Sequence, residues 1–268
     1  MSGDGPKRRR MARWIRGSGI EIGALHNPLH VPKGTTVRYV DRAPTEQLRV
    51  QYPELGSIVP VSILGDAENL SSLHDDEVDF VIANHLVEHL EDPIRGLTEL
   101  FRVIRPGGIL YMAVPDPQAT FDRRRPPTSI DHIHTEYREG TAETREQHFR
   151  DWVELAETGI NDHPRSAADA NARIEQLIEM DYSIHFHVFR PDTFIELLCL
   201  ARREVGLEFE LIDFAPCNPA ADDEFIFVLG KGAGIQDPHV EGLEPDFSTT
   251  RRSIARRVAR RVRRQLSR

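Results

Sequence analysis

Cysteine and long apolar runs are both scarce in this chain. Two cysteines among 268 residues are too few for a disulfide framework, and Cys199 lies in an apolar helical pattern, so we expect reduced thiols. No run approaches the length of a transmembrane helix, and the charged segment 1–18 has no apolar signal-peptide core. We therefore expect a cytoplasmic protein without a transmembrane segment. Its 39% of hydrophobic residues suffice for one sizeable core.

The most informative stretch, residues 79–116, has the pattern strand, helix, strand. Residues 80–83 and 109–114 are short continuous apolar runs, as strands require when helices cover both faces of a parallel sheet. Between them apolar residues recur at helical spacing as far as Ile104. We expect the glycines 107–108 to end this helix and to allow a tight return to the sheet.

Acidic residues accompany three earlier predicted strands, in order along the chain. The first strand carries Glu21 and ends at Gly23, the second leads into Asp41, and the third leads into Asp66. A glycine at a strand exit lets the backbone approach a ligand, and an acid at a strand tip can accept both ribose hydroxyls. Each acid alone is as typical of a solvated strand end, but the ordered set indicates a nucleotide-type site.

The segments HLVEHLEDP and RVIRPGGIL, together with these acids, resemble class I S-adenosylmethionine-dependent methyltransferases at their fourth and fifth strands. The resemblance implies S-adenosylmethionine as the cofactor. It also implies that Glu21 supports the loop at the cofactor's amino-acid end, after Gly23. Asp41 would hold the ribose and Asp66 would face the adenine amino group. Asn84 would touch the cofactor largely through its backbone, whereas we expect the neighbouring His85 and His89 to be structural.

The loop after Gly23 lacks the alternating glycines of a dinucleotide-binding fold. It has Ala24 to Pro28 in their place. A dinucleotide needs those glycines because its pyrophosphate lies directly on the backbone, whereas S-adenosylmethionine has no phosphate. The departure therefore disfavours a dehydrogenase. Asn27-Pro28 also argues against a helix that starts immediately after the strand.

The C-terminal part predicts a helix over 191–202 and two strands, 209–214 and 224–229. Two strands with a short connection must pair antiparallel, because a parallel crossover needs a dozen or more residues. The expected fold is α/β: a doubly wound, mostly parallel seven-stranded sheet closed by an antiparallel C-terminal hairpin, with a helical insertion after strand five. The resemblance covers roughly residues 19–115 and 191–231.

The expected organisation has four parts. They are a basic N-terminal segment 1–18, a methyltransferase domain 19–234 that includes the insertion 116–190, a linker 235–246, and a basic amphipathic tail 247–268.

The insertion 116–190 is far longer than a usual connection, and polar-faced helices are expected over 141–157 and 166–180. It would overhang the carboxyl ends of the fourth and fifth strands, where an open α/β sheet places its ligand. We therefore interpret it as a lid that covers the methyl acceptor.

Two His-x-His pairs lie in the insertion, His132 with His134 and His185 with His187. If these segments are strands, each pair shares a face. With Asp131 or Glu136 they suit a metal ion, but without a clear third ligand we expect no metal. Histidines that order the lid, or a general base for a hydroxyl acceptor, are the alternatives. As base we favour His187 or His185, and then His134.

The run Arg123, Arg124 and Arg125 is a candidate for holding a phosphate or carboxylate on the acceptor, with a solvated turn as the alternative.

The predicted function is S-adenosylmethionine-dependent methylation of a small-molecule or sugar-containing acceptor, chiefly at oxygen. One alternative is a cofactor-binding protein that has lost its chemistry. The other is a nucleic-acid methyltransferase, which is disfavoured because residues 84–87 read Asn-His-Leu-Val instead of the Asn/Asp-Pro-Pro-aromatic turn of enzymes that methylate base amino groups.

The tail 247–268 contains nine arginines and no acidic residue, and its aliphatic residues repeat every four positions. As a helix it would suit an anionic membrane surface, and the enzyme would then be peripheral at the inner membrane surface. A solvated tail is the first expectation, the membrane the second and nucleic acid the third.

Overall fold

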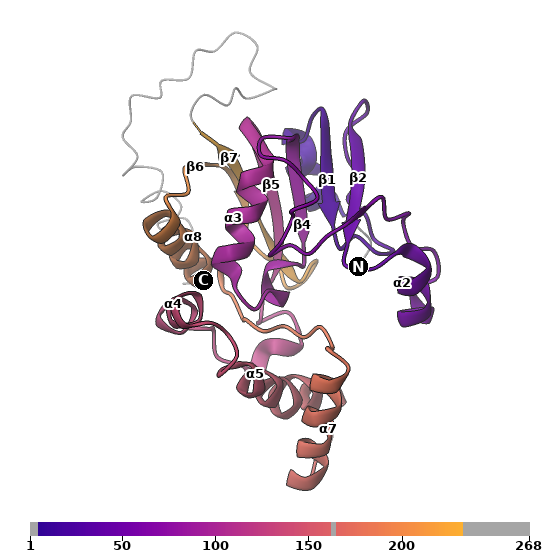
Figure 1. The fold of residues 1–268 in the computed structure, drawn as a ribbon, viewed down its shortest axis with the longest axis vertical. Helices are drawn as coiled ribbons and strands as arrows, with labels where there is room; N and C mark the ends of the chain where they lie inside the picture. The colour runs from indigo at the N-terminus through magenta and orange to yellow at the C-terminus, as the bar shows by residue number, and fades with distance from the viewer. Residues whose placement is uncertain (1–4, 162–164, 233–268) are drawn as a thin grey trace.

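The computed structural model describes residues 5–161 and 165–232, and in this part of the chain seven strands form one sheet (Figure 1). Its strand order is β3-β2-β1-β4-β5-β7-β6. Strands β1 to β5 run parallel, and β7 pairs antiparallel with both β5 and β6. The predicted sheet and hairpin are thus confirmed. The strands are β1 Ser18–Ile22, β2 Thr36–Asp41, β3 Ile63–Leu64, β4 Val78–Asn84, β5 Ile104–Pro115, β6 Phe209–Ala215 and β7 Glu224–Lys231.

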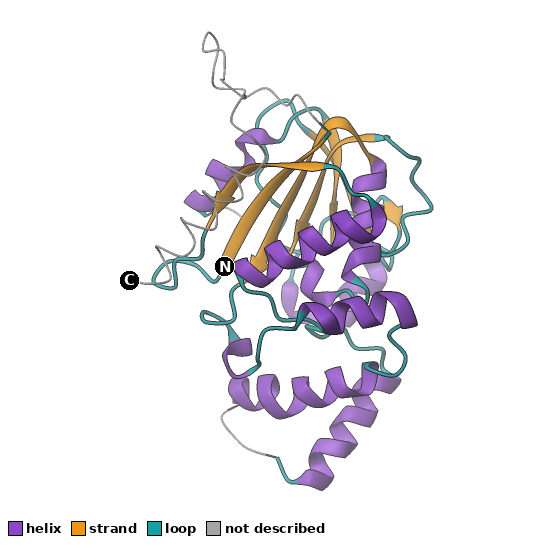
Figure 2. Ribbon diagram, turned by 90° about the vertical axis from the view of Figure 1, so that its left-hand side faces the viewer, coloured by secondary structure: helices purple, strands orange, loops and turns teal. Residues whose placement is uncertain are grey.

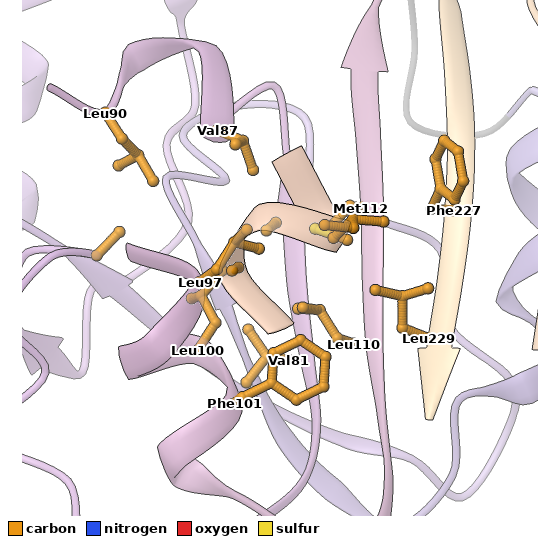
Figure 3. Close-up of a cluster of buried hydrophobic side chains, with 14 of the residues drawn as sticks. Val81, Val87, Leu90, Leu97, Leu100, Phe101, Leu110, Met112, Phe227 and Leu229 are labelled. Atoms are coloured by element: carbon orange, nitrogen blue, oxygen red, sulfur yellow. The ribbon is translucent and has the colours of Figure 1, made fainter. Parts of the chain in front are cut away.

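Helices cover both faces of the sheet, as its apolar strands require. On one face, α3 (Pro93–Val103) and α8 (Pro191–Val205) contribute to the larger hydrophobic core. Figure 3 shows Leu97 and Phe101 of α3 beside Val81 and Leu110 of the sheet. On the other face, α1 (Pro6–Met11) and the short η1 (Ala12–Trp14) pack against Phe80 and Tyr111. Residues 11, 12, 14 and 15 of the N-terminal segment are therefore part of the domain's core.

The end of α3 differs from the prediction. The helix stops at Val103, and Ile104 already belongs to β5, where it pairs with Val78. The register then shifts, and Gly107 adopts a φ of +81°, which favours glycine. The two glycines therefore form an irregularity within the strand, and they are not the helix stop that we expected. The helix ends before Ile104 because this residue is buried in the core and pairs with Val78 in the sheet.

The insertion between β5 and α8 is helical, and Figures 1 and 2 show its helices gathered beyond one end of the sheet. Phe149, Val153, Ile174 and Leu177 belong to a core of its own. Its elements are η4 Phe121–Arg124, α4 Ile130–Glu139, α5 Arg145–Asp151, η5 Trp152–Glu157 (a π-helix), α6 Thr158–Asn161 and α7 Ala167–Glu179. The remaining elements are α2 Thr45–Gln51, η2 Pro53–Leu55 and η3 Val87–His89.

Of the helices expected in the insertion, 166–180 is confirmed as α7, whereas 141–157 begins only at Arg145. Helix α4 was not predicted. Ser129 begins it by accepting a hydrogen bond from the backbone of His132. The expected linker 235–246 and tail 247–268 lie outside the described residues. Within the described part, none of the helices combines the length and the apolar character needed to span a bilayer.

Candidate active site

The carboxyl ends of β1 and β4 are joined by a buried carboxylate. Glu21 on β1 is 1% exposed, and both of its oxygens accept from the backbone N–H of Leu29, at 2.9 and 3.1 Å. The side-chain amide of Asn84, at the end of β4, donates to the same carboxylate at 3.3 Å. Burial raises the pKa of Glu21 to about 7, although these hydrogen bonds and the charge of Arg8 act in the opposite direction. Glu21 thus fixes the loop that follows β1.

That loop begins at Gly23, which has a φ of +66°, and no helix follows it directly, as Asn27-Pro28 predicted. A Cβ on Gly23 would meet no atom within 4 Å, so open space lies beside the backbone at this strand exit. A ligand can therefore approach the main chain here.

Two more acids continue the same edge of the sheet. Asp41 ends β2, is 9% exposed and accepts from the backbone N–H of Arg42 at 2.8 Å. Burial raises its pKa, against the effect of the backbone hydrogen bonds. Asp66 follows β3 and accepts from the backbone N–H of Glu68 at 2.7 Å. Since β3, β2, β1 and β4 are successive neighbours, the strand ends that carry the predicted cofactor residues lie side by side.

A cavity of about 440 Å³ lies at the carboxyl ends of β4 and β5, under the insertion. Its lining includes His85, Pro115, Phe121, Arg123, His185 and Asp223. His85 directly follows Asn84, which bonds Glu21, so the cavity adjoins the row of strand ends described above. The sequence placed His85 among the structural residues and gave no signal for its position on this cavity.

His185 is the predicted histidine that borders the cavity. Its Nδ1 lies 2.6 Å from Oδ2 of Asp122, and its side chain is 9% exposed. Asp122 also accepts from the guanidinium of Arg125 at 2.9 Å. Burial opposes ionisation of Asp122, but the hydrogen bond and charge of His185 and those of Arg125 outweigh it and lower its pKa. Asp122 therefore orients the imidazole ring of His185 as an ionised acceptor.

The three arginines of the run separate in the structure. Arg125 is 6% exposed and donates to the carbonyls of His185 and Phe186, at 2.7 and 3.1 Å. Its guanidinium therefore holds residues 185–186 in place. Arg124 is exposed, and Arg123 lines the cavity. Only the first of the three is thus placed to meet an acceptor there.

The other two predicted bases lie elsewhere. His187 is 0% exposed, its Nε2 lies 3.2 Å from the carbonyl of Glu91, and burial lowers its pKa to about 3. His134 lies 3.4 Å from Glu204 of α8. The expectation that His132 and His134 share a face was wrong, because they lie on the helix α4, where positions i and i+2 diverge.

The strand order, with its antiparallel β7, matches the fold of class I S-adenosylmethionine-dependent methyltransferases. Residues 17–112 match the family model of a methyltransferase domain. Through residues 17–112 the chain resembles that class.

Two curated relatives match part of the chain. A protein named as a probable S-adenosylmethionine-dependent methyltransferase from Mycolicibacterium smegmatis is 33% identical over 119 residues, which cover 44% of this chain and 39% of the relative. An uncharacterized transposon protein from Streptomyces fradiae is 32% identical over 102 residues, or 37% of this chain and 28% of the relative. The matched segments thus span well under half of these relatives.

Among solved structures, one described as a zinc-dependent alcohol dehydrogenase from Rhodobacter sphaeroides covers 87% of this chain and 92% of its own, with a TM-score of 0.50 and 14% identity. At that identity the likeness shows the fold alone.

The residues at the strand ends fit the cofactor of this class, S-adenosylmethionine. Carboxylates can accept ribose hydroxyls and an adenine amino group, and the open space at Gly23 admits a ligand that lies against the backbone.

Proposed function

We propose that the protein transfers a methyl group from S-adenosylmethionine to a small-molecule or sugar-containing acceptor, chiefly at oxygen. The cavity of about 440 Å³ carries this proposal. It adjoins the cofactor edge through Asn84 and His85, and its volume lies within the range of small-molecule sites.

At the cofactor edge, each residue has a distinct part. When bound, S-adenosylmethionine supplies a methyl group on a positively charged sulfur. Asp41 would accept the ribose hydroxyls, and Asp66 would face the adenine. Glu21 and Asn84 hold the loop beside the amino-acid end, where Gly23 leaves room.

On the acceptor side, the chain supplies position and exclusion of water, which carry much of the barrier reduction in an in-line displacement. Phe121 and Pro115 provide apolar wall, and Arg123 provides a cation for a phosphate or carboxylate on the acceptor. His185, oriented by Asp122, is the one of the three predicted bases that lines the cavity, where it can contact the acceptor oxygen.

The test is methyl transfer from isotopically labelled S-adenosylmethionine to a small-molecule panel that includes phosphorylated and sugar-containing hydroxyl compounds. Label should appear on a small molecule. His185→Ala should lower turnover by roughly 10²–10⁴-fold, as for loss of a group that acts on the reacting oxygen. Its affinity for S-adenosylhomocysteine should stay near that of the wild type.

Tight cofactor binding without transfer to any acceptor would favour the non-catalytic alternative. Label that appears only on added nucleic acid would favour the other. Wild-type turnover in His185→Ala would remove that histidine from the acceptor site.

A further inference from the structure

The carboxylate of Glu88 has no hydrogen-bond partner among the described residues. It lies in η3, directly after β4, and is 1% exposed. Neither carboxylate oxygen has a hydrogen-bond partner, and Nδ1 of His85 stays 3.7 Å from Oε1. Buried polar groups are nearly always paired, and an unpaired buried carboxylate is costly. A cation beside Glu88 would remove this cost.

Two imidazoles lie close to Glu88, and the Nδ1 atom of each is held by a hydrogen bond. Nδ1 of His89 lies 2.8 Å from the carbonyl of Ile184, which can only accept, so this nitrogen carries the proton. Nδ1 of His185 lies 2.6 Å from the carboxylate of Asp122, which holds it in the same tautomer. When both rings are neutral, Nε2 of each keeps a lone pair that can bind an ion.

Such outer partners are what metal-binding histidines have, because a carbonyl or carboxylate on one nitrogen fixes the ring and directs the other at the ion. The rings of His89 and His185 stand nearly perpendicular at 89°, with centroids 4.7 Å apart.

We propose that Glu88, His89 and His185 bind a divalent first-row transition-metal ion such as Zn²⁺. One ligand atom from each residue lies within 4.8 Å of the other two. Ligand atoms on a tetrahedral zinc lie about 3.3 Å apart. The ligand atoms here would therefore have to approach one another by up to about 1.5 Å, which side-chain rotations can supply.

Two imidazoles and one carboxylate leave the fourth position of a tetrahedral ion open. Because His185 also lines the cavity, an ion held by it would lie beside the cavity. An oxygen of the acceptor would take the open position, and this part of the inference rests on the proposed function. With Nε2 on the ion, His185 would act on that oxygen through the metal and not by direct contact. The metal site itself does not, because it concerns ion binding by the protein alone.

A second cluster of the same composition supplies the contrast. His132, Glu136 and His148 also lie close together, but Oε1 of Glu136 accepts from His148 at 2.7 Å, from His132 at 3.0 Å and from the hydroxyl of Thr144. Those hydrogen bonds stabilise the charge of Glu136 without an ion. Oε2 of Glu136 has no hydrogen-bond partner, but Oε1 is paired, whereas neither oxygen of Glu88 is paired. The second cluster therefore provides a matched control.

The experiment measures metal in tag-free protein that has been stripped with a chelator, reloaded with Zn²⁺ and dialysed. We expect about one Zn²⁺ per chain by elemental mass spectrometry, as for a site with three protein ligands. His89→Ala and the nearly isosteric Glu88→Gln should each lose more than about nine-tenths of it, since two ligands do not hold the ion through dialysis. The control His132→Ala should retain it. Co²⁺ in place of Zn²⁺ should give visible absorption in the wild type and in the control alone.

Circular dichroism and S-adenosylhomocysteine affinity show whether each variant is folded. A folded wild type that retains no Zn²⁺ overturns the site, and Glu88 is then a protonated buried acid. Equal loss in His132→Ala, or retention in Glu88→Gln, overturns it as well. Methyl transfer by metal-free protein would overturn the site's role in the reaction and leave the proposed function standing. Stoichiometric Zn²⁺ without any methyl transfer would overturn the proposed function and leave the metal site standing.

Discussion

The side-chain amide of Asn84 donates to the buried carboxylate of Glu21 at 3.3 Å and so ties the end of β4 to the end of β1. The two residues are 63 positions apart in the chain. This contact joins the cofactor edge, through the next residue His85, to the cavity under the insertion. The consequences of this arrangement can be measured residue by residue.

Asp41→Ala should weaken S-adenosylmethionine binding by roughly 1.5–3 kcal/mol, because the variant loses hydrogen bonds from the ribose to a charged group. Isothermal titration calorimetry measures this directly. Asp131→Ala, which removes an exposed aspartate of α4, is the control and should bind as the wild type does. Equal affinity in both variants, or tight NAD binding by the wild type, would contradict the role of Asp41.

Cofactor binding should depend on the ionisation of Glu21. Since the pKa of Glu21 is raised to about 7 by burial, a large fraction is protonated below neutral pH. The cationic cofactor favours the ionised form, so affinity should rise by roughly 10-fold, or 1.4 kcal/mol, as pH increases from 6 to 8. Glu21→Gln should remove that part of the dependence. Parallel pH profiles in the two proteins would show that Glu21 does not titrate in this range.

His187→Ala should destabilise the protein and leave chemistry nearly intact. The side chain is 0% exposed and bonded to the carbonyl of Glu91, so its loss should lower the free energy of unfolding by about 1–3 kcal/mol. Chemical denaturation measures this, and turnover per folded molecule is compared with His185→Ala. A large fall in turnover at unchanged stability would instead make His187 the base.

Arg123→Ala should raise the KM for an anionic acceptor by roughly 10-fold or more, because a charged hydrogen bond contributes about 1.5–3 kcal/mol. Arg124→Ala is the matched control, since Arg124 follows Arg123 in sequence, is also exposed and does not line the cavity. Steady-state kinetics with a phosphorylated and a neutral acceptor separate the two. If both arginines raise KM alike, the effect is long-range charge and not contact.

Stability at low pH should depend on Glu224. Burial opposes its ionisation, but hydrogen bonds from Arg8 and His85 outweigh burial and lower its pKa to about 2. A lowered carboxyl pKa stabilises the fold above the ordinary value of 4.5, and this contribution is lost as pH falls toward 2. It should reach up to about 3 kcal/mol. Glu224→Gln should therefore be less stable at pH 7, with the gap closing between pH 5 and 2. A constant gap would contradict the pairing.

The sheet could be predicted because its strands are short apolar runs and its last two strands are joined by a short connection. The end of α3 could not be predicted, because Ile104 fits the helical spacing and also the pattern of β5. Its pairing with Val78, which is distant in sequence, places it in the strand. Helix α4 was missed for a similar reason. Its alternating histidines also fit a strand, and the hydrogen bond that Ser129 accepts at the N-terminus stabilises the helix instead.

The sequence by itself determined the order of the acids at the cofactor edge, since the carboxyl ends of parallel neighbouring strands must meet at one side of the sheet. Only the tertiary structure decided which of the three predicted bases lines the cavity. Asp122 and His185 are 63 residues apart, and the Nδ1 of His89 reaches a carbonyl 95 residues away. No local periodicity encodes such contacts, because they arise when the insertion folds back over the strand ends. That folding brings His185 to Asp122 and to the cavity, while His187, two residues on, is buried against Glu91.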